Sequence, residues 1–522
     1  MGAKKPVAVV VGGSIAGLSC AHALISAGWR ATVIEKTAGP PSGSPTGAGL
    51  GLDPESLRLV CRWTSDPNFL HAATVPLSID INRATDSKRK VSRTLTRDEG
   101  FNFRAAHWAD LHSILLQALP PGTVVWGHQF LSFDVSNDKS FVVTKSRVLP
   151  TDEVVEIAGD LLVAADGCLS SIRRHFLPNF KLRYSGYTAW RGILDFTGKE
   201  SSDIIVGVRR AYPELGDCLY FDLATGTHCV LYELKGKRLN WLWYVNGPEP
   251  EHKGSSVTIK ASNDMIQKMH EEAEKVWVAE LSRIMKETEE PFVNVIYDSD
   301  PLPRLFWDNV VLIGDAAHPT TPHGLRSTNM SIQDVGILGY CLEKWGLEHL
   351  SMALEEFQRI RLPVVSKQVL HSRKLGRLKQ GLVVNGQETF DPMTATPEEC
   401  QQLQQRRIPY FEEINSSIDE NKAIIVVASI IGHLVCILCF GAPTTRENVA
   451  CALLRLAQLD DLHLAIDGSG VIPALVALLE IGGSHGKDVA IVLFTLLASK
   501  ENSSPIMELV TLFIALLSHP DL

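Results

Sequence analysis

The stretch VAVVVGGSIAGLSCAHALISAGWRATVIEK, residues 7–36, decides the fold. Its β-branched apolar run Val7–Val11 indicates a short strand, and the run breaks into a glycine turn at Gly12–Gly17. Leu18–Ala27 then has the composition of a helix, and Ala31–Ile34 is a second strand that ends on Glu35. This order of strand, glycine turn, helix, strand and acid is typical of a dinucleotide-binding unit.

Each residue type in the turn suits a phosphate-bearing ligand. Gly12 permits a tight turn, and Gly13 and Ser14 keep side chains small where a pyrophosphate approaches the backbone. The start of the following helix offers N–H groups to phosphate, and Gly17 allows the helix to pack closely on the strand. Glu35 can accept hydrogen bonds from a ribose hydroxyl. Because Ser14 replaces the usual middle glycine, a tight βα turn in an ordinary α/β sheet is the alternative.

The bulk composition narrows the class of protein. A chain of 522 residues predicts two or three domains, and 45% hydrophobic with 21% charged residues is typical of folded proteins. A net charge of -9 excludes a general nucleic-acid binder. The ten cysteines have no framework spacing, and Cys436 and Cys439 are interpreted as buried thiols. The first strand leaves no room for a signal peptide, so we expect a cytoplasmic protein.

Two further turns follow apolar strands. Asp160–Ala165 ends in Asp166-Gly167, with Arg173 in a short helix beyond it. Asn309–Ile313 ends in Gly314-Asp315-Ala316-Ala317-His318-Pro319, and a helix is expected from about residue 329 to 345. An aspartate at a strand end can bond a ribose or ribitol hydroxyl, and the next helix start can stabilise negative charge on a ring carbonyl.

The segments between these turns have distinct patterns. The aromatic, alternating stretch 184–246 predicts a mostly antiparallel sheet that could form the wall of an aromatic-lined pocket. Helices are expected over Ala105–Leu119, over Asn263–Thr288 and, interrupted at Pro363, over Leu350–Leu378. The glycine-rich segment 47–51 allows close approach of a ligand, and a surface loop is its alternative.

The three turn motifs, in this order, resemble those of single-component FAD-dependent aromatic-ring hydroxylases. The likeness covers roughly residues 5–410, and it is closest to the urate hydroxylase and dihydroxypyridine hydroxylase branch with its plant relatives. It implies an α/β fold in which a Rossmann-like FAD/NAD(P)-binding domain (residues 1–180 and 300–385) carries an inserted antiparallel-sheet substrate domain (181–299). A linker over 386–415 and a helical tail over 416–522 complete the expected division.

The resemblance places the FAD contacts on the turn motifs and on the segment after Pro322. The candidate cofactor-binding residues are Gly12, Gly13, Ser14, Ala16, Gly17, Glu35, Lys36, Gly49, Arg104, Asp166, Gly167, Gly314, Asp315, Pro322, Gly324, Ser327, Thr328 and Asn329. One departure is notable: the family usually has a G-x-G turn where this chain has Gly324-Leu325-Arg326. A cation at Arg326 would favour a reduced, anionic flavin.

The implied reaction uses NADH or NADPH to reduce FAD. O₂ then gives a flavin C4a-hydroperoxide, which hydroxylates a small aromatic or heteroaromatic substrate. A group that raises the electron density of the substrate ring is needed, and Arg191, His323 and Tyr232 are the candidate catalytic residues. Ordinary structural roles are the alternative for each of them. No metal-ligand spacing is visible, and Trp241-Leu242-Trp243 lacks the Ile-Pro of a halogenase motif.

Past about residue 410 the pattern changes. Segments such as Gly470–Leu479 resemble the armadillo repeats of plant U-box proteins, with helices in pairs and about forty residues per unit. Such a tail predicts a protein partner, and the junction is either a real fusion or a gene-model artefact. Ala423–Ala442 is the one membrane candidate, and a repeat helix is favoured over a span. A degenerate flavoprotein scaffold with a partner-binding tail is the alternative to an enzyme.

Overall fold

The computed structural model describes residues 5–41, 47–64, 67–86, 88–251, 256–384 and 389–404. The chain divides into two compact units, Met1–Ile408 and Pro409–Leu522. The armadillo-like tail, Cys436, Cys439 and the stretch 423–442 lie outside the described residues. Among the described helices, none is long and apolar enough to cross a membrane.

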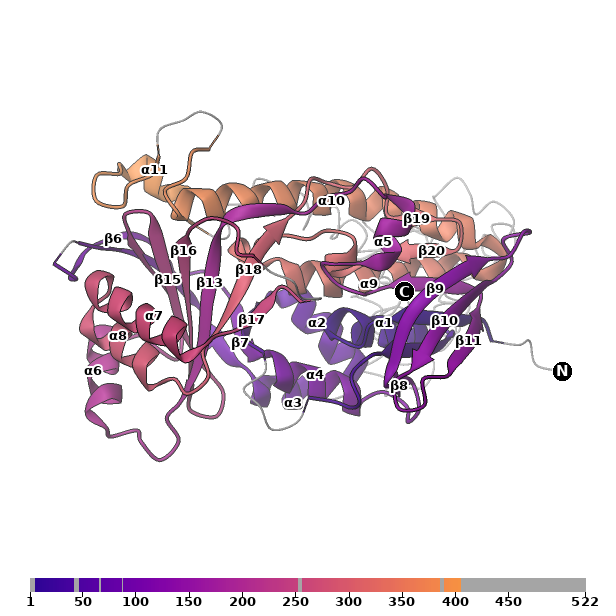
Figure 1. The fold of residues 1–522 in the computed structure, drawn as a ribbon, viewed down its shortest axis with the longest axis horizontal. Helices are drawn as coiled ribbons and strands as arrows, with labels where there is room; N and C mark the ends of the chain where they lie inside the picture. The colour runs from indigo at the N-terminus through magenta and orange to yellow at the C-terminus, as the bar shows by residue number, and fades with distance from the viewer. Residues whose placement is uncertain are drawn as a thin grey trace, which may run out of the picture. The chain divides into compact units, whose positions relative to one another are not determined.

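A six-stranded sheet forms around the first strand (Figure 1). Its strands, in spatial order, are β19 (Phe306–Trp307), β20 (Val310–Leu312), β12 (Leu161–Ala164), β1 (Val7–Val11), β2 (Arg30–Glu35) and β8 (Val124–Trp126). All neighbours pair in parallel except β19 with β20. Parallel strands are buried on both faces, which explains why β1 and β12 are continuous apolar runs.

Helices and small sheets surround this sheet. The helices are α1 (Ile15–Ser26), α2 (Pro54–Thr64), α3 (Pro67–Ala73), α4 (Trp108–Gln117), α5 (Ser171–Phe176), α9 (Ser327–Trp345) and α10 (Leu350–Lys379). One three-stranded sheet has the order β11 (Val154–Gly159), β10 (Val142–Val148), β9 (His128–Val135). Another has the order β3 (Gly49–Leu52), β7 (Phe103–His107), β4 (Val75–Leu77). Short 3₁₀ turns η1 (Gly314–Ala316), η2 (His323–Leu325) and η3 (Leu347–His349) flank α9.

An eight-stranded sheet forms the second large layer. Its order is β17 (Thr258–Lys260), β18 (Phe292–Asp298), β13 (Arg183–Asp195), β16 (Arg238–Asn246), β15 (Thr227–Leu234), β14 (Cys218–Ala224), β5 (Ile79–Thr85) and β6 (Val91–Asp98). Every pair is antiparallel except β14 with β5. Helices α6 (Asp203–Ala211), α7 (Asn263–Val276) and α8 (Ala279–Glu287) cover the face turned away from α1 and α9 (Figure 1). The short helix α11 (Pro397–Gln401) contacts β6.

Several sequence expectations need correction. Residues 103–107, expected to lead into and begin a helix, form β7, and the helix starts at Trp108. Helix α6 lies within the stretch 184–246 that was expected to be mostly antiparallel sheet, and the expected helical region 263–288 consists of two helices. Helix α10 continues through Pro363 without a break. The substrate sheet also takes β5 and β6 from residues 79–98, so it is not confined to the expected 181–299.

Candidate functional site

The three turn motifs converge at the carboxyl ends of β1, β12 and β20. Gly12 approaches the second motif so closely that a Cβ on it would lie 2.3 Å from the carbonyl oxygen of Ala165. Gly314, with φ at +55°, packs against the first motif, and its Cβ would lie 3.2 Å from the Cβ of Ala16. Ligands of open α/β sheets bind in the crevice beyond these strand ends.

Arg173 joins the second and third motifs. Its side chain is 1% exposed. One terminal nitrogen, Nη1, donates to the carbonyls of Asp315 (3.1 Å) and Ala316 (2.8 Å), and the other, Nη2, donates to the carbonyl of Cys168. A buried guanidinium with three carbonyl acceptors holds the two loops at a fixed separation. The sequence showed Arg173 next to Asp166-Gly167, but this spanning role was not predicted.

A buried carboxylate orients the third motif. Asp334 on α9 accepts hydrogen bonds from the Gly314 amide (3.0 Å) and from His318 (2.5 Å) through Oδ2, and from Arg361 (2.9 Å) through Oδ1. Burial acts to raise the pKa of Asp334, but the charges of His318 and Arg361 lower it overall. The carboxylate is therefore ionised, and it fixes the backbone next to Asp315.

The phosphate-binding turn is held from two sides. Glu35 accepts a hydrogen bond from the Gly13 amide at 2.7 Å, and His112 on α4 donates from Nε2 to the Gly13 carbonyl at 2.8 Å. Ser14 caps α1 through its backbone and makes no side-chain capping bond, and the first turn of α1 carries no acidic residue. This helix start therefore offers a positive dipole end to a diphosphate. His112 was not predicted, because it lies beside the apolar face of its helix.

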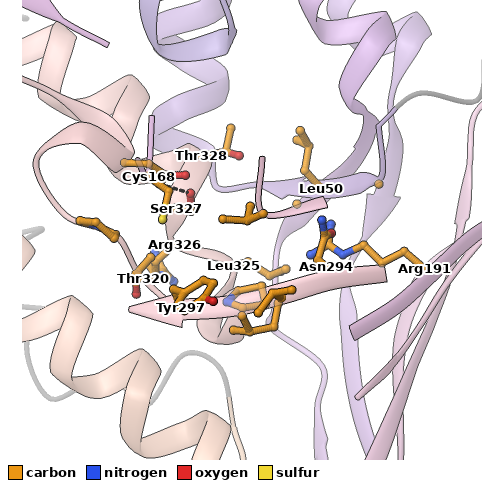
Figure 2. A pocket seen from close by; sticks show the side chains of 18 residues that line it. Leu50, Cys168, Arg191, Asn294, Tyr297, Thr320, Leu325, Arg326, Ser327 and Thr328 are labelled. Carbon is orange, nitrogen blue, oxygen red and sulfur yellow. Dashed lines mark hydrogen bonds between the residues drawn. The ribbon is translucent and has the colours of Figure 1, made fainter. Parts of the chain in front are cut away.

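A cavity of about 260 Å³ lies between these loops and the eight-stranded sheet (Figure 2). Its lining residues come from five regions: β3, the loop after β12, the residue before β17, the segment from Asp315 to Thr328, and strands β13 and β18. They are Gly49, Leu50, Gly51, Cys168, Arg191, Val257, Asn294, Val295, Ile296, Tyr297, Asp315, Pro319, Thr320, Pro322, Leu325, Arg326, Ser327 and Thr328. Burial raises the pKa of the Cys168 thiol to about 12, so this side chain is neutral.

The turn before α9 has an uncommon backbone. Gly324 and Leu325 have φ values of +80° and +55°, and a positive φ is strained for leucine. Asn329 stabilises the turn, since its Nδ2 donates to the carbonyls of Leu325 and Gly51. The Leu325 side chain packs on Gly51, where a Cβ would lie 2.7 Å from Leu325 Cδ1. The glycine-rich turn of the resembled family is thus replaced by a leucine that fills space beside β3.

Arg191 is the one predicted catalytic candidate that lines the cavity. Its buried Nε has no hydrogen-bond partner in the part of the chain that the structure describes. Burial raises the pKa of the adjacent Tyr244 to about 12, although the Arg191 charge acts in the opposite direction. The arginine side chain extends from β13 toward Leu50 in Figure 2.

Tyr232 and His323 are buried behind the cavity wall and do not line it. The Tyr232 hydroxyl lies close to Gly49, where a Cβ would be 2.6 Å from it. His323 contacts His228 through their Nε2 atoms at 3.2 Å, and Gln380 Oε1 accepts from His228 Nδ1 at 2.7 Å. Burial lowers the pKa of both histidines well below the usual value, so both are neutral. Their catalytic roles stay predictions.

The predicted cofactor residues divide into two groups. Gly49, Asp315, Pro322, Ser327 and Thr328 line the cavity, and the others are not among its lining residues. Lys36 is exposed. Arg104 lies on β7, where its guanidinium donates to the Thr74 hydroxyl (2.7 Å) and to the carbonyls of His71 and Thr74 (both 3.2 Å). The proposed contact of Arg104 with the ADP half of FAD stays a prediction.

The residues present fit a bound flavin nucleotide. Asp166 Oδ2 accepts hydrogen bonds from the amides of Ser171 and Ile172 at the start of α5, and its buried Oδ1 has no partner among the described residues. A Cβ on Gly167 would meet nothing within 4 Å, so the backbone there is open to a ligand. Asp315 lines the cavity and accepts a hydrogen bond from Ser327 Oγ at 2.8 Å. A second acceptor position of this carboxylate is suited to a polyol hydroxyl.

Comparison with known proteins defines the class. Residues 4–191 match the family described as FAD binding domain. The fold is that of solved flavin hydroxylases. Klebsiella pneumoniae HpxO, complexed with FAD and uric acid, has a TM-score of 0.62 and 20% identity over 78% of this chain and 96% of that chain. Residues 4–191 are therefore an FAD-binding domain.

Particular relatives extend the comparison. The 2,6-dihydroxypyridine-3-hydroxylase from Arthrobacter nicotinovorans has a TM-score of 0.62 and 21% identity, covering 74% of this chain and 97% of that one. In sequence, the 6-hydroxynicotinate 3-monooxygenase of Bordetella bronchiseptica is 25% identical over 70% of this chain and 89% of its own length. The 3-amino-4-hydroxybenzoate 2-monooxygenase of Streptomyces cremeus is 28% identical over 70% of this chain and 86% of its own length.

Proposed function

We propose that this protein is an FAD-dependent monooxygenase that uses NADH or NADPH and O₂ to hydroxylate a small aromatic or heteroaromatic compound. The observation that carries the proposal is the cavity, whose lining includes Asp315, Ser327 and Thr328 from the loop segment and Arg191, Asn294 and Tyr297 from the eight-stranded sheet. A flavin ring held by the loop segment would leave the residues of the sheet for a substrate. The names of the sequence relatives, which include monooxygenases of hydroxynicotinate and aminohydroxybenzoate, agree with this class of reaction.

When bound, FAD supplies the redox chemistry, and the protein supplies binding, orientation and exclusion of water. We assign the ADP half to Gly12–Gly17 and Glu35, and the ribityl chain to Asp315. Arg191 is the residue that we place on the substrate. A cation beside a ring hydroxyl favours the ionised form of that hydroxyl, and the ionised oxygen donates electron density to the ring that is to be hydroxylated.

The domain boundaries at residues 180, 300 and 385 also stay proposals. We propose a protein partner for the armadillo-like tail on its repeat pattern alone, because the tail lies outside the described residues.

The test is NAD(P)H oxidation by the purified, yellow holoenzyme. The rate is measured with each member of a panel of purines, pyridines and phenols, and hydroxylated product is quantified by mass spectrometry. We expect at least one ring compound to accelerate oxidation and to give a product heavier by one oxygen atom from ¹⁸O₂. A colourless protein that takes up no added FAD would support the scaffold alternative.

A further inference from the structure

A buried cation lines the cavity at a position where the resembled family has a small residue. The Arg326 side chain is 1% exposed and lies at the end of the Gly324–Leu325 turn. Its guanidinium carbon is 5.5 Å from the centroid of the Phe103 ring, and its Nη1 is 3.3 Å from Asp53 Oδ2. Burial lowers the pKa of Arg326, against the opposing effect of Asp53, but an arginine stays protonated in proteins.

The partner carboxylate does not line the cavity. Asp53 lies before α2, where its Oδ1 accepts from the Ser56 amide at 2.7 Å, and its Oδ2 accepts from Gln333 Nε2 at 3.0 Å. The negative charge of Asp53 is therefore stabilised by a helix start and a side-chain amide. Only the positive member of the pair, Arg326, is part of the cavity wall.

The other charged groups near the cavity do not cancel the positive charge of Arg326. Arg191 is a second cation, and Asp315 is the one carboxylate, among the lining residues. His371 on α10 is neutral at pH 7, because burial first and the charges of Arg326 and Lys374 second lower its pKa to about 4. A charge that is as buried as that of Arg326 is screened less than a surface charge.

We infer that Arg326 is an electrostatic residue that stabilises negative charge on a reduced flavin ring and so raises the reduction potential of the bound FAD. The inference rests on the proposed function, since it takes the cavity as the site of the flavin ring. Figure 2 shows Arg326 on the same wall as Thr320 and Ser327, across the cavity from Leu50. An easily reduced flavin favours hydride transfer from NAD(P)H.

A structural role makes a different prediction. If Arg326 only docks α9 against α2 through Asp53, its removal lowers stability and leaves the properties of the bound flavin unchanged. The decisive measurements are therefore the midpoint potential of the bound flavin and its affinity for sulfite, which adds to oxidised flavins more tightly beside a positive charge. Neither measurement requires a substrate or turnover.

The experiment compares the full-length holoenzyme with Arg326→Gln, Arg326→Lys and the surface control Arg97→Gln. Arg97 is exposed and pairs with Glu99 and Glu214 on the surface, so its loss changes the net charge by the same amount. We expect Arg326→Gln to weaken sulfite binding about tenfold and to lower the potential by about 30 mV, the equivalent of tenfold for a two-electron couple. Arg326→Lys should retain most of both properties, and Arg97→Gln should match the wild type.

A second variant tests the sign of the effect. Asp53→Asn keeps an acceptor for the Ser56 amide but removes the carboxylate charge, so it should raise the potential and tighten sulfite binding. If Arg326→Gln binds FAD with unchanged potential and sulfite affinity, the inference is wrong and the proposed function stands. If Arg326→Gln loses FAD, the Asp53→Asn result decides, and an unchanged or lower potential in that variant refutes the inference. A wild-type protein that binds no FAD refutes the proposed function itself.

Discussion

At the scale of single residues, Asp315 has the most direct predicted contact with the cofactor. It lines the cavity, and its backbone is fixed by Arg173 at its carbonyl and by Asp334 at the preceding amide. Ser327 Oγ occupies one acceptor position of the carboxylate. The remaining positions are preorganised for a hydroxyl group, because the backbone on both sides of the residue is held by buried ions.

We predict that Asp315→Ala weakens FAD retention about tenfold to a hundredfold, the effect of losing a hydrogen bond to a charged acceptor. The measurement is the dissociation constant of FAD by fluorescence titration of the apoprotein. Asp315→Asn keeps one acceptor oxygen and should lose less. Unchanged FAD affinity in Asp315→Ala would contradict the assignment of the ribityl chain to this carboxylate.

The sequence predicted which residues form the turn motifs. It did not predict the residues whose contacts join distant parts of the chain. Asp315 stands out because an aspartate follows a strand and a glycine. Asp53 carries a weaker signal, since an aspartate before Pro54 is typical of a helix start. Arg173 was part of the second motif, but its contact with the third motif was not predicted. His112 and Asp334 were not predicted either, because their partners are distant in sequence and only the folded chain brings them together.

At the scale of elements, helix α10 forms the support behind the loop that precedes α9. Gly376 on this helix lies against Tyr187 and His323, and a Cβ there would be 2.3 Å from the Tyr187 hydroxyl and 2.7 Å from His323 Nδ1. Both partners are buried and packed on each other with rings perpendicular. The position of η2, and with it the cavity wall at Pro322 and Leu325, depends on this close approach.

We predict that Gly376→Ala destabilises the protein by about 2 kcal/mol, as overpacking of a core does, and that it raises KM for the aromatic substrate. Urea denaturation and steady-state kinetics measure the two effects. The matched control is Gly207→Ala on α6, where the nearest atom to a Cβ would be Glu280 Cγ at 3.5 Å. That variant should be neutral or more stable by up to about 1 kcal/mol. Equal stability of the two variants would contradict the packing argument.

Element prediction failed where tertiary contacts outweighed local preference. Proline at position 363 removes one hydrogen bond and normally ends a helix, yet α10 continues because Arg361 and Phe357 are buried against its neighbours. Phe103–His107 was read as the approach to a helix and its first residues, but β3 and β4 both pair with this segment. The two strands and the helix of the first βαβ unit were predicted, although α1 begins at Ile15 rather than at Leu18, because continuous apolar runs and a glycine turn mark them.

At the scale of the whole molecule, buried histidine side chains make the free energy of unfolding depend on pH. Burial lowers the pKa of His228 and of His323 well below 6.5, and neighbouring Lys379 and, for His323, Arg191 and His228 lower it further. The unfolded chain therefore binds more protons than the folded chain below pH 6.5. The free energy of unfolding is therefore unaffected by these histidines above pH 6.5. It decreases as the pH falls from 6.5 toward their pKa values in the folded chain.

We predict that the free energy of unfolding decreases by about 1 kcal/mol or more between pH 7.5 and pH 5.5. Urea denaturation at the two pH values gives this difference. His228→Gln should reduce the difference while lowering stability at pH 7.5. Part of the dependence should remain in that variant, because His22 and His112 are shifted in the same direction by burial. If the change in the free energy of unfolding between pH 7.5 and pH 5.5 is the same in His228→Gln as in the wild type, the pair of His228 and His323 does not contribute to it.

The parallel pairing of β5 with β14 limits how the chain can be divided into parts that fold alone. The hairpin of β5 and β6 belongs by sequence to the nucleotide-binding half, but it completes the sheet of the other half. If residues 181–299 were removed, β5 would lose β14 as its partner and would have an open edge, and open edges invite aggregation. Residues 181–299 are therefore not a separable unit, because the hairpin of β5 and β6 completes their sheet.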